Sequence, residues 1–451
     1  MKGQYLTILM SILIVTCCLS QSGDTNQSNS FTYKKQKDTL PNSQIASSQD
    51  PEFDGWTFNS DDALRVHQSY TLKEFREVND NTKYVWMHLD EFMPTSIIVR
   101  EGEVSKLKYS LMPEISQITA KTDLGILTLD EYIKKSELQG IIVVYKGKIV
   151  YERYPRMRSF DKHLYFSVTK VFSGTEIAML EEEGKVDVSK PIGQYLPELN
   201  KSDWGKVKIS DILNMTTGMT LQVGDPKALV DSNNVLFQFL STMGIMEKTS
   251  FTTNNIWDAL NKMQKLKEPG TAFDYSNTNA ILLELLAQQV SGKTFAEFIS
   301  EKIWKKMGAE ADAYIALSPQ GIATVSTTMN STLRDLARFG MLFTPHWNVV
   351  SKEKIISDSY LNKIQHGGAD PSIFDKGAMG REIIENIQEK PDHNSYQWDF
   401  VMQDGDFYKA GVRGQGLYIS PAKDLVIACF SHGDHNSVAY LRSIAKSGLF
   451  P

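Results

Sequence analysis

A serine and a lysine lie three residues apart in the stretch 167–170 (SVTK). If a helix begins here, both residues lie on one helical face, and the Lys170 amine can reach the Ser167 hydroxyl. A serine hydroxyl becomes a good nucleophile beside a base, and a lysine is such a base once burial and positive neighbours lower its pKa. The same spacing also arises by chance on solvated helices, so the rest of the chain has to decide between the two interpretations.

A phenol and an amide follow further along the chain. Tyr275 and Asn277 lie between a Glu-Pro-Gly turn and the apolar run 281–290 (ILLELLAQQV). Presented into a cleft, a phenol close to two lysine amines would have a lowered pKa and could relay protons. The alternative is a simple turn in which Asn277 caps the helix that follows.

A third cluster precedes the last apolar segments. Lys409 and Ala410 lead into Gly411, Val412 and a glycine-rich run (RGQG). Glycine lets a strand edge approach a ligand closely, and the Val412 amide could donate to an oxyanion. Lys409 would supply positive charge for a substrate carboxylate or for the tyrosine. Alone, this run is also typical of a glycine-rich entry into a strand.

Apolar patterns between these clusters predict the fold that positions them. Residues 140–154 (GIIVVYKGKIVYERY) predict a β-hairpin turning at Lys146 and Gly147. Further strands are expected over 417–419 and 425–430, and helices over 281–290, 295–307, 331–343 and 438–449. We therefore expect an α+β (α/β) fold. Its first and last strands pair in one antiparallel sheet, and its middle forms a helical lobe across a cleft.

The order S-x-x-K, Y-x-N and K-A-G before a terminal strand pair resembles the serine β-lactamase and penicillin-binding-protein superfamily. The likeness is to the branch that holds class C β-lactamases, esterases and 6-aminohexanoate-dimer hydrolases. Supporting stretches are 147–152 (GKIVYE), 209–219 (ISDILNMTTGM), 268–277 and 330–340 (NSTLRDLARFG). The last of these most resembles the 6-aminohexanoate-dimer hydrolases. The resemblance covers roughly residues 136–440 and implies a β-lactamase/transpeptidase-like fold, with an antiparallel sheet flanked by helices and a helical second lobe.

The resemblance also implies roles for the catalytic residues. Ser167 would be the acylated nucleophile and Lys170 its base. Tyr275 would protonate the leaving group and activate the water for deacylation. Asn277 would orient Lys170 and the substrate. Because these residues are all present, a catalytically silent binding or sensor protein on this fold is the less favoured alternative.

On the binding side, the resemblance implies that Lys409 binds or polarises the substrate. The backbone amides of Ser167 and Val412, next to Gly411, would form the oxyanion hole. This chain departs from the family at Ala410, where a threonine or serine often binds a β-lactam carboxylate. The departure favours hydrolysis of an ester or small amide. A D-Ala-D-Ala carboxypeptidase or β-lactamase that acts on cell-wall peptides or β-lactams remains the alternative.

The N-terminus is typical of an export signal. Lys2 precedes an apolar run at 5–15, which is too short to span a membrane, and Cys17 and Cys18 follow it. Lipidation of one of these cysteines would make a lipoprotein in the periplasm or outer cell envelope. Plain secretory cleavage and an uncleaved anchor are the alternatives.

We therefore expect four segments. Residues 1–18 are the signal, and 19–50, rich in Ser, Asn, Gln and Asp, form a flexible tether. Residues 51–135 are an N-terminal extension in which we find no chemistry, and 136–451 are the hydrolase domain.

Composition narrows the classes of function. The 451 residues are 41% hydrophobic and 23% charged, with a formal net charge of −6 and no run rich in lysine or arginine. This argues against nucleic-acid binding. The resemblance implies a small-molecule ester, amide or peptide as the partner. We expect no cofactor and no metal, because His432 and His435 are more typical of a solvated loop than of a metal site. Cys429 lies in an apolar run and is expected in the core.

Overall fold

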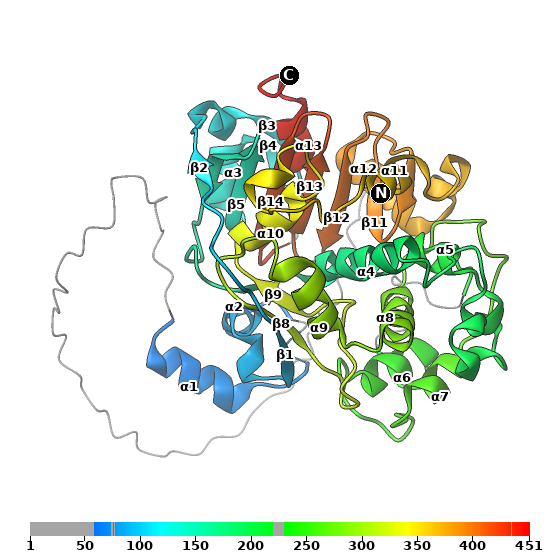
Figure 1. The fold of residues 1–451 in the computed structure, drawn as a ribbon. Helices are drawn as coiled ribbons and strands as arrows, with labels where there is room; N and C mark the ends of the chain where they lie inside the picture. The colour runs from blue at the N-terminus through cyan, green and yellow to red at the C-terminus, as the bar shows by residue number, and fades with distance from the viewer. Residues whose placement is uncertain (1–57, 74, 76, 220–229, 434) are drawn as a thin grey trace, which may run out of the picture.

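The computed structural model describes residues 58–73, 75, 77–219, 230–433 and 435–451 (Figure 1). The predicted signal and tether, with Cys17 and Cys18, lie outside the described residues. Within them, no helix is long and apolar enough to cross a membrane.

An eight-stranded sheet forms the centre of the molecule, in the order β10-β11-β12-β13-β14-β5-β6-β2. Its strands are β2 (Lys108–Tyr109), β5 (Leu138–Tyr145), β6 (Lys148–Arg153), β10 (His393–Ser395), β11 (Trp398–Val401), β12 (Phe407–Gly411), β13 (Gln415–Ser420) and β14 (Leu425–Ser431). The hairpin predicted between β5 and β6 is confirmed: Lys146 and Gly147 both take positive φ angles, of 46° and 73°. The pairing of the two ends of the catalytic unit is also confirmed, because β14 lies antiparallel to β5.

Both faces of this sheet are buried, which explains why β5 reads as a continuous apolar run. Ile142 and Val144 on one face join a core with the helices α4 (Lys170–Glu182), α8 (Asn277–Ser291) and α10 (Leu333–Met341). Ile141 and Val143 on the other face join a second core with α3 (Leu129–Lys135) and α13 (Ser437–Lys446). Figure 1 shows α4 and α10 on one side of the strands and α3 and α13 on the other.

The helical second lobe is built around α4 and α8, which pack against each other. It also contains α5 (Ile209–Leu213), α6 (Val235–Thr242), α7 (Ile256–Asn261) and α9 (Phe295–Ile299). The α9 helix continues as one turn of π-helix, Ser300–Trp304, so the helix predicted over 295–307 is confirmed in most of its length. The predicted α+β architecture, with an antiparallel sheet and a helical lobe, is confirmed.

The N-terminal extension contributes strands to both of the larger sheets. A second, four-stranded sheet has the order β1-β8-β9-β7. Its strands are β1 (Thr95–Ile98), β7 (His163–Leu164), β8 (Ala313–Ala316) and β9 (Met329–Ser331). Here β1 of the extension pairs with β8, while β2 pairs in parallel with β6 of the central sheet. The extension also supplies α1 (Ser60–Ser69), α2 (Asp80–Met87) and the hairpin of β3 (Thr119–Thr122) with β4 (Gly125–Thr128).

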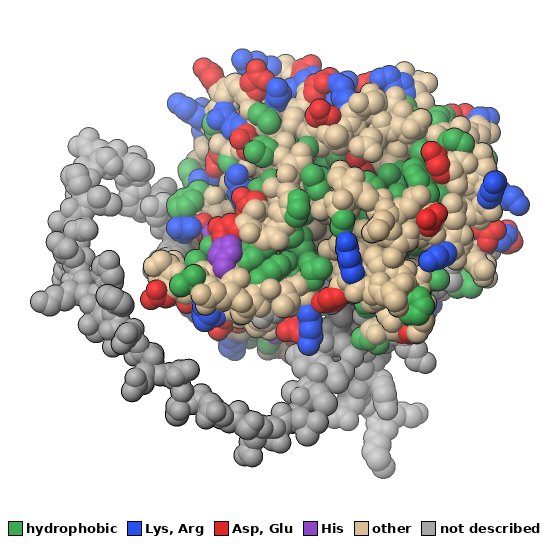
Figure 2. Space-filling view, turned by 90° about the horizontal axis from the view of Figure 1, so that it is seen from below, with side chains coloured by type: hydrophobic (Ala, Val, Ile, Leu, Met, Phe, Trp, Pro, Cys, Tyr) green, Lys and Arg blue, Asp and Glu red, His purple; other side chains and the backbone are tan. Residues whose placement is uncertain are grey.

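Two expectations need correction. The helix predicted over 331–343 begins at Leu333, because residues 329–331 pair as β9 with β7 and β8. The region 345–400, for which the sequence patterns predicted no helix or strand, contains α11 (Asp358–His366), α12 (Ala378–Ile387), β10 and β11. Figure 2 shows lysine and arginine side chains interspersed with acidic ones on the face it presents, with no continuous basic area there.

Candidate active site

Ser167 lies in a tight turn at the entrance to α4. The turn is a 3₁₀ helix, Phe166–Thr169, and α4 begins directly after it at Lys170. Phe166 has a φ of 46°, a left-handed conformation that a bulky residue seldom adopts without support from its surroundings. That support comes from the extension, because the Phe166 ring meets Trp86 edge-on, with 4.7 Å between ring centroids. The nucleophile is therefore presented by a strained turn that other elements hold in place.

Lys170 has the surroundings that a lysine base requires. Its side chain is fully buried (0% exposed), and its Nζ lies 2.8 Å from Ser167 Oγ and donates to the Ser326 carbonyl at 2.6 Å. Burial and then the positive charge of Lys409 hold the Lys170 pKa well below its usual range. The lowered pKa favours the neutral form of the amine, which can accept the Ser167 proton.

Tyr275 lies between the two lysines. Lys170 Nζ is 5.0 Å and Lys409 Nζ 4.4 Å from the centre of its ring, and its hydroxyl accepts a hydrogen bond from Lys409 Nζ at 3.0 Å. The predicted lowering of its pKa is wrong. Burial and then the negative charge of Asp399 hold the Tyr275 pKa well above its usual value, although a hydrogen bond with Ser167 opposes the shift. Tyr275 therefore stays protonated and can donate a proton.

Asp399 is the site residue that our sequence analysis missed. It lies on β11 and accepts a hydrogen bond from Lys409 Nζ with one carboxylate oxygen and from the Ala410 amide, at 2.8 Å, with the other. Lys409 is fully buried and Asp399 is 5% exposed, so the pair is closed off from water. Asp399 is the sole charged residue in the apolar stretch 396–402 (YQWDFVM), a signal that could have pointed to a buried partner.

The end of β12 packs directly on the turn that carries Ser167. A Cβ atom at Gly411 would lie 2.4 Å from the Tyr165 carbonyl oxygen, so glycine is required for this close approach. The turn after Gly411 includes Arg413, with a φ of 68°, and places the Val412 side chain against the cluster of Trp86 and Phe166. This packing brings the Val412 segment beside the Ser167 turn, as an oxyanion hole requires.

Asn277 is placed differently from the two expectations for it. The cap of α8 is Ser276, whose hydroxyl accepts from the Thr278 amide at 3.2 Å, and Asn277 is the first residue of the helix. The Asn277 side chain is half-buried and makes no hydrogen bond with any described residue. The Lys170 amine is hydrogen-bonded to Ser167 and Ser326, and not to Asn277.

The C-terminal histidines are not both solvated, as we had expected. His432 is buried, hydrogen-bonded to the Thr82 hydroxyl at 2.9 Å and packed on Trp86, and burial lowers its pKa to about 2. His435 is paired with Asp123 at 2.9 Å. Across the described ranges, no group of three or more His, Cys, Asp or Glu residues could hold a metal ion. Cys429 is buried in the core, as predicted.

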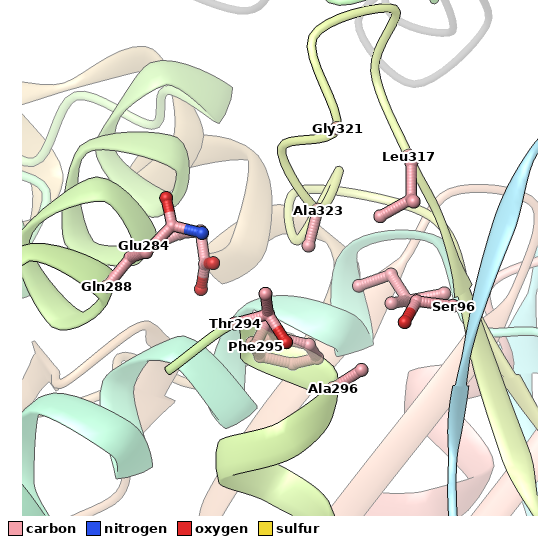
Figure 3. A pocket seen from close by; sticks show the side chains of 10 residues that line it. Ser96, Glu284, Gln288, Thr294, Phe295, Ala296, Leu317, Gly321 and Ala323 are labelled. Carbon is pink, nitrogen blue, oxygen red and sulfur yellow. The ribbon is translucent and has the colours of Figure 1, made fainter. Parts of the chain in front are cut away.

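A small cavity lies away from these residues, behind α8 (Figure 3). Its volume is about 50 Å³, and it is lined by Glu284 and Gln288 of α8, by the start of α9 and by the strands β1 and β8. Ser167, Lys170, Tyr275 and Lys409 do not line it. It is therefore distinct from the candidate active site.

Comparison with known proteins identifies a family for this chain. Residues 129–446 match the family model described as Beta-lactamase. The chain belongs to the beta-lactamase family. Its match covers every catalytic candidate from Ser167 to Val412, and the predicted relationship is confirmed.

Individual members of known structure or function show what the chain is similar to. A 6-aminohexanoate-dimer hydrolase of Paenarthrobacter ureafaciens is 22% identical over 365 residues, which cover 80% of this chain and 88% of the relative. A solved protein of Bacillus anthracis named after the same enzyme is 24% identical and superposes with a TM-score of 0.69, over 84% of this chain and 95% of its own. A penicillin-binding protein homologue of Pyrococcus abyssi has a TM-score of 0.53 at 18% identity, over 71% of this chain and 76% of its own. These structures share the fold.

Proposed function

We propose that the protein is a serine hydrolase that forms an acyl-enzyme on Ser167 and hydrolyses an ester or a small amide. The observation that carries the proposal is the buried Lys170 amine 2.8 Å from Ser167 Oγ, with a pKa held well below its usual range. A neutral amine at this distance can take the serine proton as the oxygen attacks. The name of the Paenarthrobacter ureafaciens relative, a 6-aminohexanoate-dimer hydrolase, supports hydrolysis as the class of reaction.

Acylation then follows from the contacts of the site. Ser167 Oγ attacks the substrate carbonyl carbon and gives its proton to Lys170 Nζ. The backbone amides of Ser167 and Val412 stabilise the negative oxygen that develops. When the tetrahedral intermediate collapses, Tyr275 protonates the departing alcohol or amine, and the proton held by Lys170 replaces the one that Tyr275 gave.

Deacylation reverses these roles. A water molecule takes the place of the leaving group, gives one proton to the Tyr275 and Lys170 pair, and attacks the ester bond to Ser167. The products are the free acid and the regenerated serine. Lys409 holds the Tyr275 hydroxyl in position throughout, through the hydrogen bond of 3.0 Å.

Two reagents distinguish this function from the alternative of a cell-wall peptidase or β-lactamase. The protein is incubated with a fluorophosphonate and, separately, with a penicillin, and intact mass and peptide mapping locate any adduct. A fluorophosphonate adduct on Ser167 without a penicillin adduct is the expected result. A long-lived adduct with both reagents would favour a penicillin-binding protein. Fast penicillin turnover would favour a β-lactamase. The absence of any adduct on Ser167 would show that Ser167 is not the nucleophile.

We also propose that the protein is exported and lipid-anchored through Cys17 or Cys18. The support is the short apolar run at 5–15 after Lys2, followed by two cysteines. Metabolic labelling with an alkyne fatty acid in a bacterial host tests this. A labelled wild type and an unlabelled variant lacking both cysteines are expected. An unlabelled wild type would contradict the anchor.

A further inference from the structure

The ion pair at the end of β12 carries an inference about the substrate, which rests on the proposed function. β12 packs on the turn that carries Ser167, and Lys409 reaches the Tyr275 hydroxyl, so a group next to the bond that Ser167 attacks would lie close to Lys409 and Ala410. Whether these residues can bind a charged substrate group depends on whether their hydrogen-bond donors and charge already have partners within the protein. Lys409 is engaged on two sides, by the Tyr275 hydroxyl at 3.0 Å and by the Asp399 carboxylate.

Asp399 is built into the sheet so that it meets Lys409. The antiparallel pairing of β11 with β12 sets Phe400 opposite Tyr408, and the next position along places Asp399 opposite Lys409. With both of its oxygens engaged and 5% of its surface exposed, Asp399 is held in one orientation. Its negative charge therefore stays beside Lys409 whether or not a substrate is bound.

The pair removes the features that would hold a substrate carboxylate. The positive charge of Lys409 is compensated by Asp399. The Ala410 amide already donates to Asp399, and the alanine side chain has no donor of its own. An anionic group placed here would meet the Asp399 charge without gaining a free hydrogen-bond donor, which is unfavourable in a site with little water.

The neighbouring cations do not replace these donors in the structure. Lys267 lies near the start of the Tyr275 loop and is paired with Asp274 at 2.6 Å. Arg413, in the turn after β12, has an interaction partner of its own. Among the described residues, these two cations both have interaction partners already.

We infer that Asp399 is a specificity-determining residue, which makes the site prefer substrates whose group beside the scissile ester or amide is uncharged. A repulsive element of this kind selects by excluding the wrong substrate. Asp399 acts on the substrate through its charge and through Lys409, without taking part in bond making.

Two esters that differ in one charge test the inference. The phenylacetyl ester of glycolamide is neutral, and the phenylacetyl ester of glycolate carries a carboxylate one carbon from the leaving oxygen. The ratio of their kcat/KM values is measured, because any general effect on catalysis cancels in it. We expect the wild type to prefer the neutral ester by about tenfold or more, and Asp399→Asn to reduce this ratio about tenfold.

Two further variants sharpen the test. Asp358→Asn removes the same charge from an aspartate whose side chain is 86% exposed on α11, and it should leave the ratio unchanged. Ala410→Thr adds a hydroxyl next to the ion pair and should lower the ratio without removing Asp399. If Asp399→Asn does not fold, the ratio measured for Ala410→Thr still tests the inference.

The outcomes separate this inference from the proposed function. A wild-type ratio near one, a preference for the anionic ester, or an unchanged ratio in Asp399→Asn would overturn the role of Asp399. In each of those cases a fluorophosphonate adduct on Ser167 would leave the proposed function standing. If neither ester is hydrolysed and Ser167 is not labelled, both the proposed hydrolase function and the role of Asp399 are contradicted.

Discussion

At the scale of single residues, the site depends on one buried lysine being neutral and one buried tyrosine staying protonated. Both follow from the same cause, since burial disfavours the charged form of each group. Asp399 adds to the shift at Tyr275 and opposes it at Lys170. Lys170 is therefore suited to act as the general base and Tyr275 as the general acid.

Replacing the base should separate catalysis from stability. In Lys170→Met the methionine fills most of the same space without an amine, so acylation should fall about 10²–10⁴-fold. The melting temperature should change little, because a buried lysine contributes little net stability. Stopped-flow ester hydrolysis and calorimetry measure the two effects. A melting temperature that falls together with activity would mean that Lys170 has a structural role.

Tyr275→Phe keeps the ring and removes the hydroxyl. We expect turnover to fall about 10²-fold or more, and an acyl adduct on Ser167 to accumulate during hydrolysis, because deacylation loses its proton carrier. Rapid-quench intact mass spectrometry detects the adduct. Turnover within a factor of about two of the wild type would exclude Tyr275 from proton transfer.

The sequence was sufficient to predict Ser167, Lys170, Tyr275 and Lys409 as candidates, because their spacing and order could be read directly. It was not sufficient for the Tyr275 pKa, which depends on a carboxylate 124 positions further on that folding brings close. Asp399 went unnoticed although it is the sole charged residue in an apolar stretch. Its partner Lys409 is on the neighbouring strand, and no local pattern relates the two.

At the scale of elements, α4 and α8 position the base and the tyrosine relative to each other. Two carboxylates meet between them, Glu176 of α4 and Glu284 of α8, both fully buried. Burial raises the pKa of Glu284 to about 8 and holds that of Glu176 well above its usual value. Two negative charges side by side in a buried site would repel each other, so the pair keeps a proton. Glu284 also lines the cavity in Figure 3.

This pair predicts a loss of stability at alkaline pH. A carboxyl whose folded pKa is raised contributes stability that is complete below its unfolded value of 4.5 and is lost as the pH rises through about 8. Glu284→Gln keeps a hydrogen bond to Glu176 without this titration. Its melting temperature should therefore fall less than that of the wild type between pH 5 and pH 9, by about 2–4 °C.

Calorimetry at several pH values measures this difference. Glu301→Gln, at a carboxylate whose side chain is 53% exposed, is the matched control and should follow the wild type. Equal alkaline losses in Glu284→Gln and the wild type would show that the pair does not hold the proton.

The elements themselves were largely predictable, because hydrophobic periodicity and turn residues mark them locally. The hairpin of β5 and β6 and the pair of β13 and β14 were found in this way. The elements within 345–400 were not, since β10 and β11 are short and α11 and α12 bury few residues, which leaves them without a marked apolar pattern. The pairing of β2 with β6 depends on contacts distant in sequence.

At the scale of the whole molecule, the N-terminal extension is part of the catalytic body. Trp86 packs on Phe166 and on His432, and its carbonyl accepts from the Asn330 side chain at 2.8 Å. Since Phe166 precedes the nucleophile, the extension supports the conformation of the turn that carries it. The sequence did not predict these contacts, because they join residues that are between 80 and 346 positions apart.

Trp86→Ala should therefore affect both stability and acylation. The loss of a fully buried tryptophan costs about 3–5 kcal/mol of unfolding free energy, and the released Phe166 should slow acylation about tenfold or more. Denaturant unfolding and ester hydrolysis well below the melting temperature measure the two. Trp204→Ala removes an equally buried tryptophan from the helical lobe and should lower stability alone. An unchanged acylation rate in the folded Trp86→Ala protein would contradict the support of the turn.

The central claim, that a neutral Lys170 activates Ser167, is tested most directly by the pH dependence of fluorophosphonate labelling. The rate is followed by intact mass from pH 5 to pH 10, and peptide mapping locates the adduct. We predict an adduct on Ser167 that forms rapidly at pH 7 and slows towards acid as Lys170 is protonated. Lys170→Met should label about 10²-fold more slowly or worse throughout. A labelling rate at pH 7 that is the same in the wild type and Lys170→Met would contradict the account.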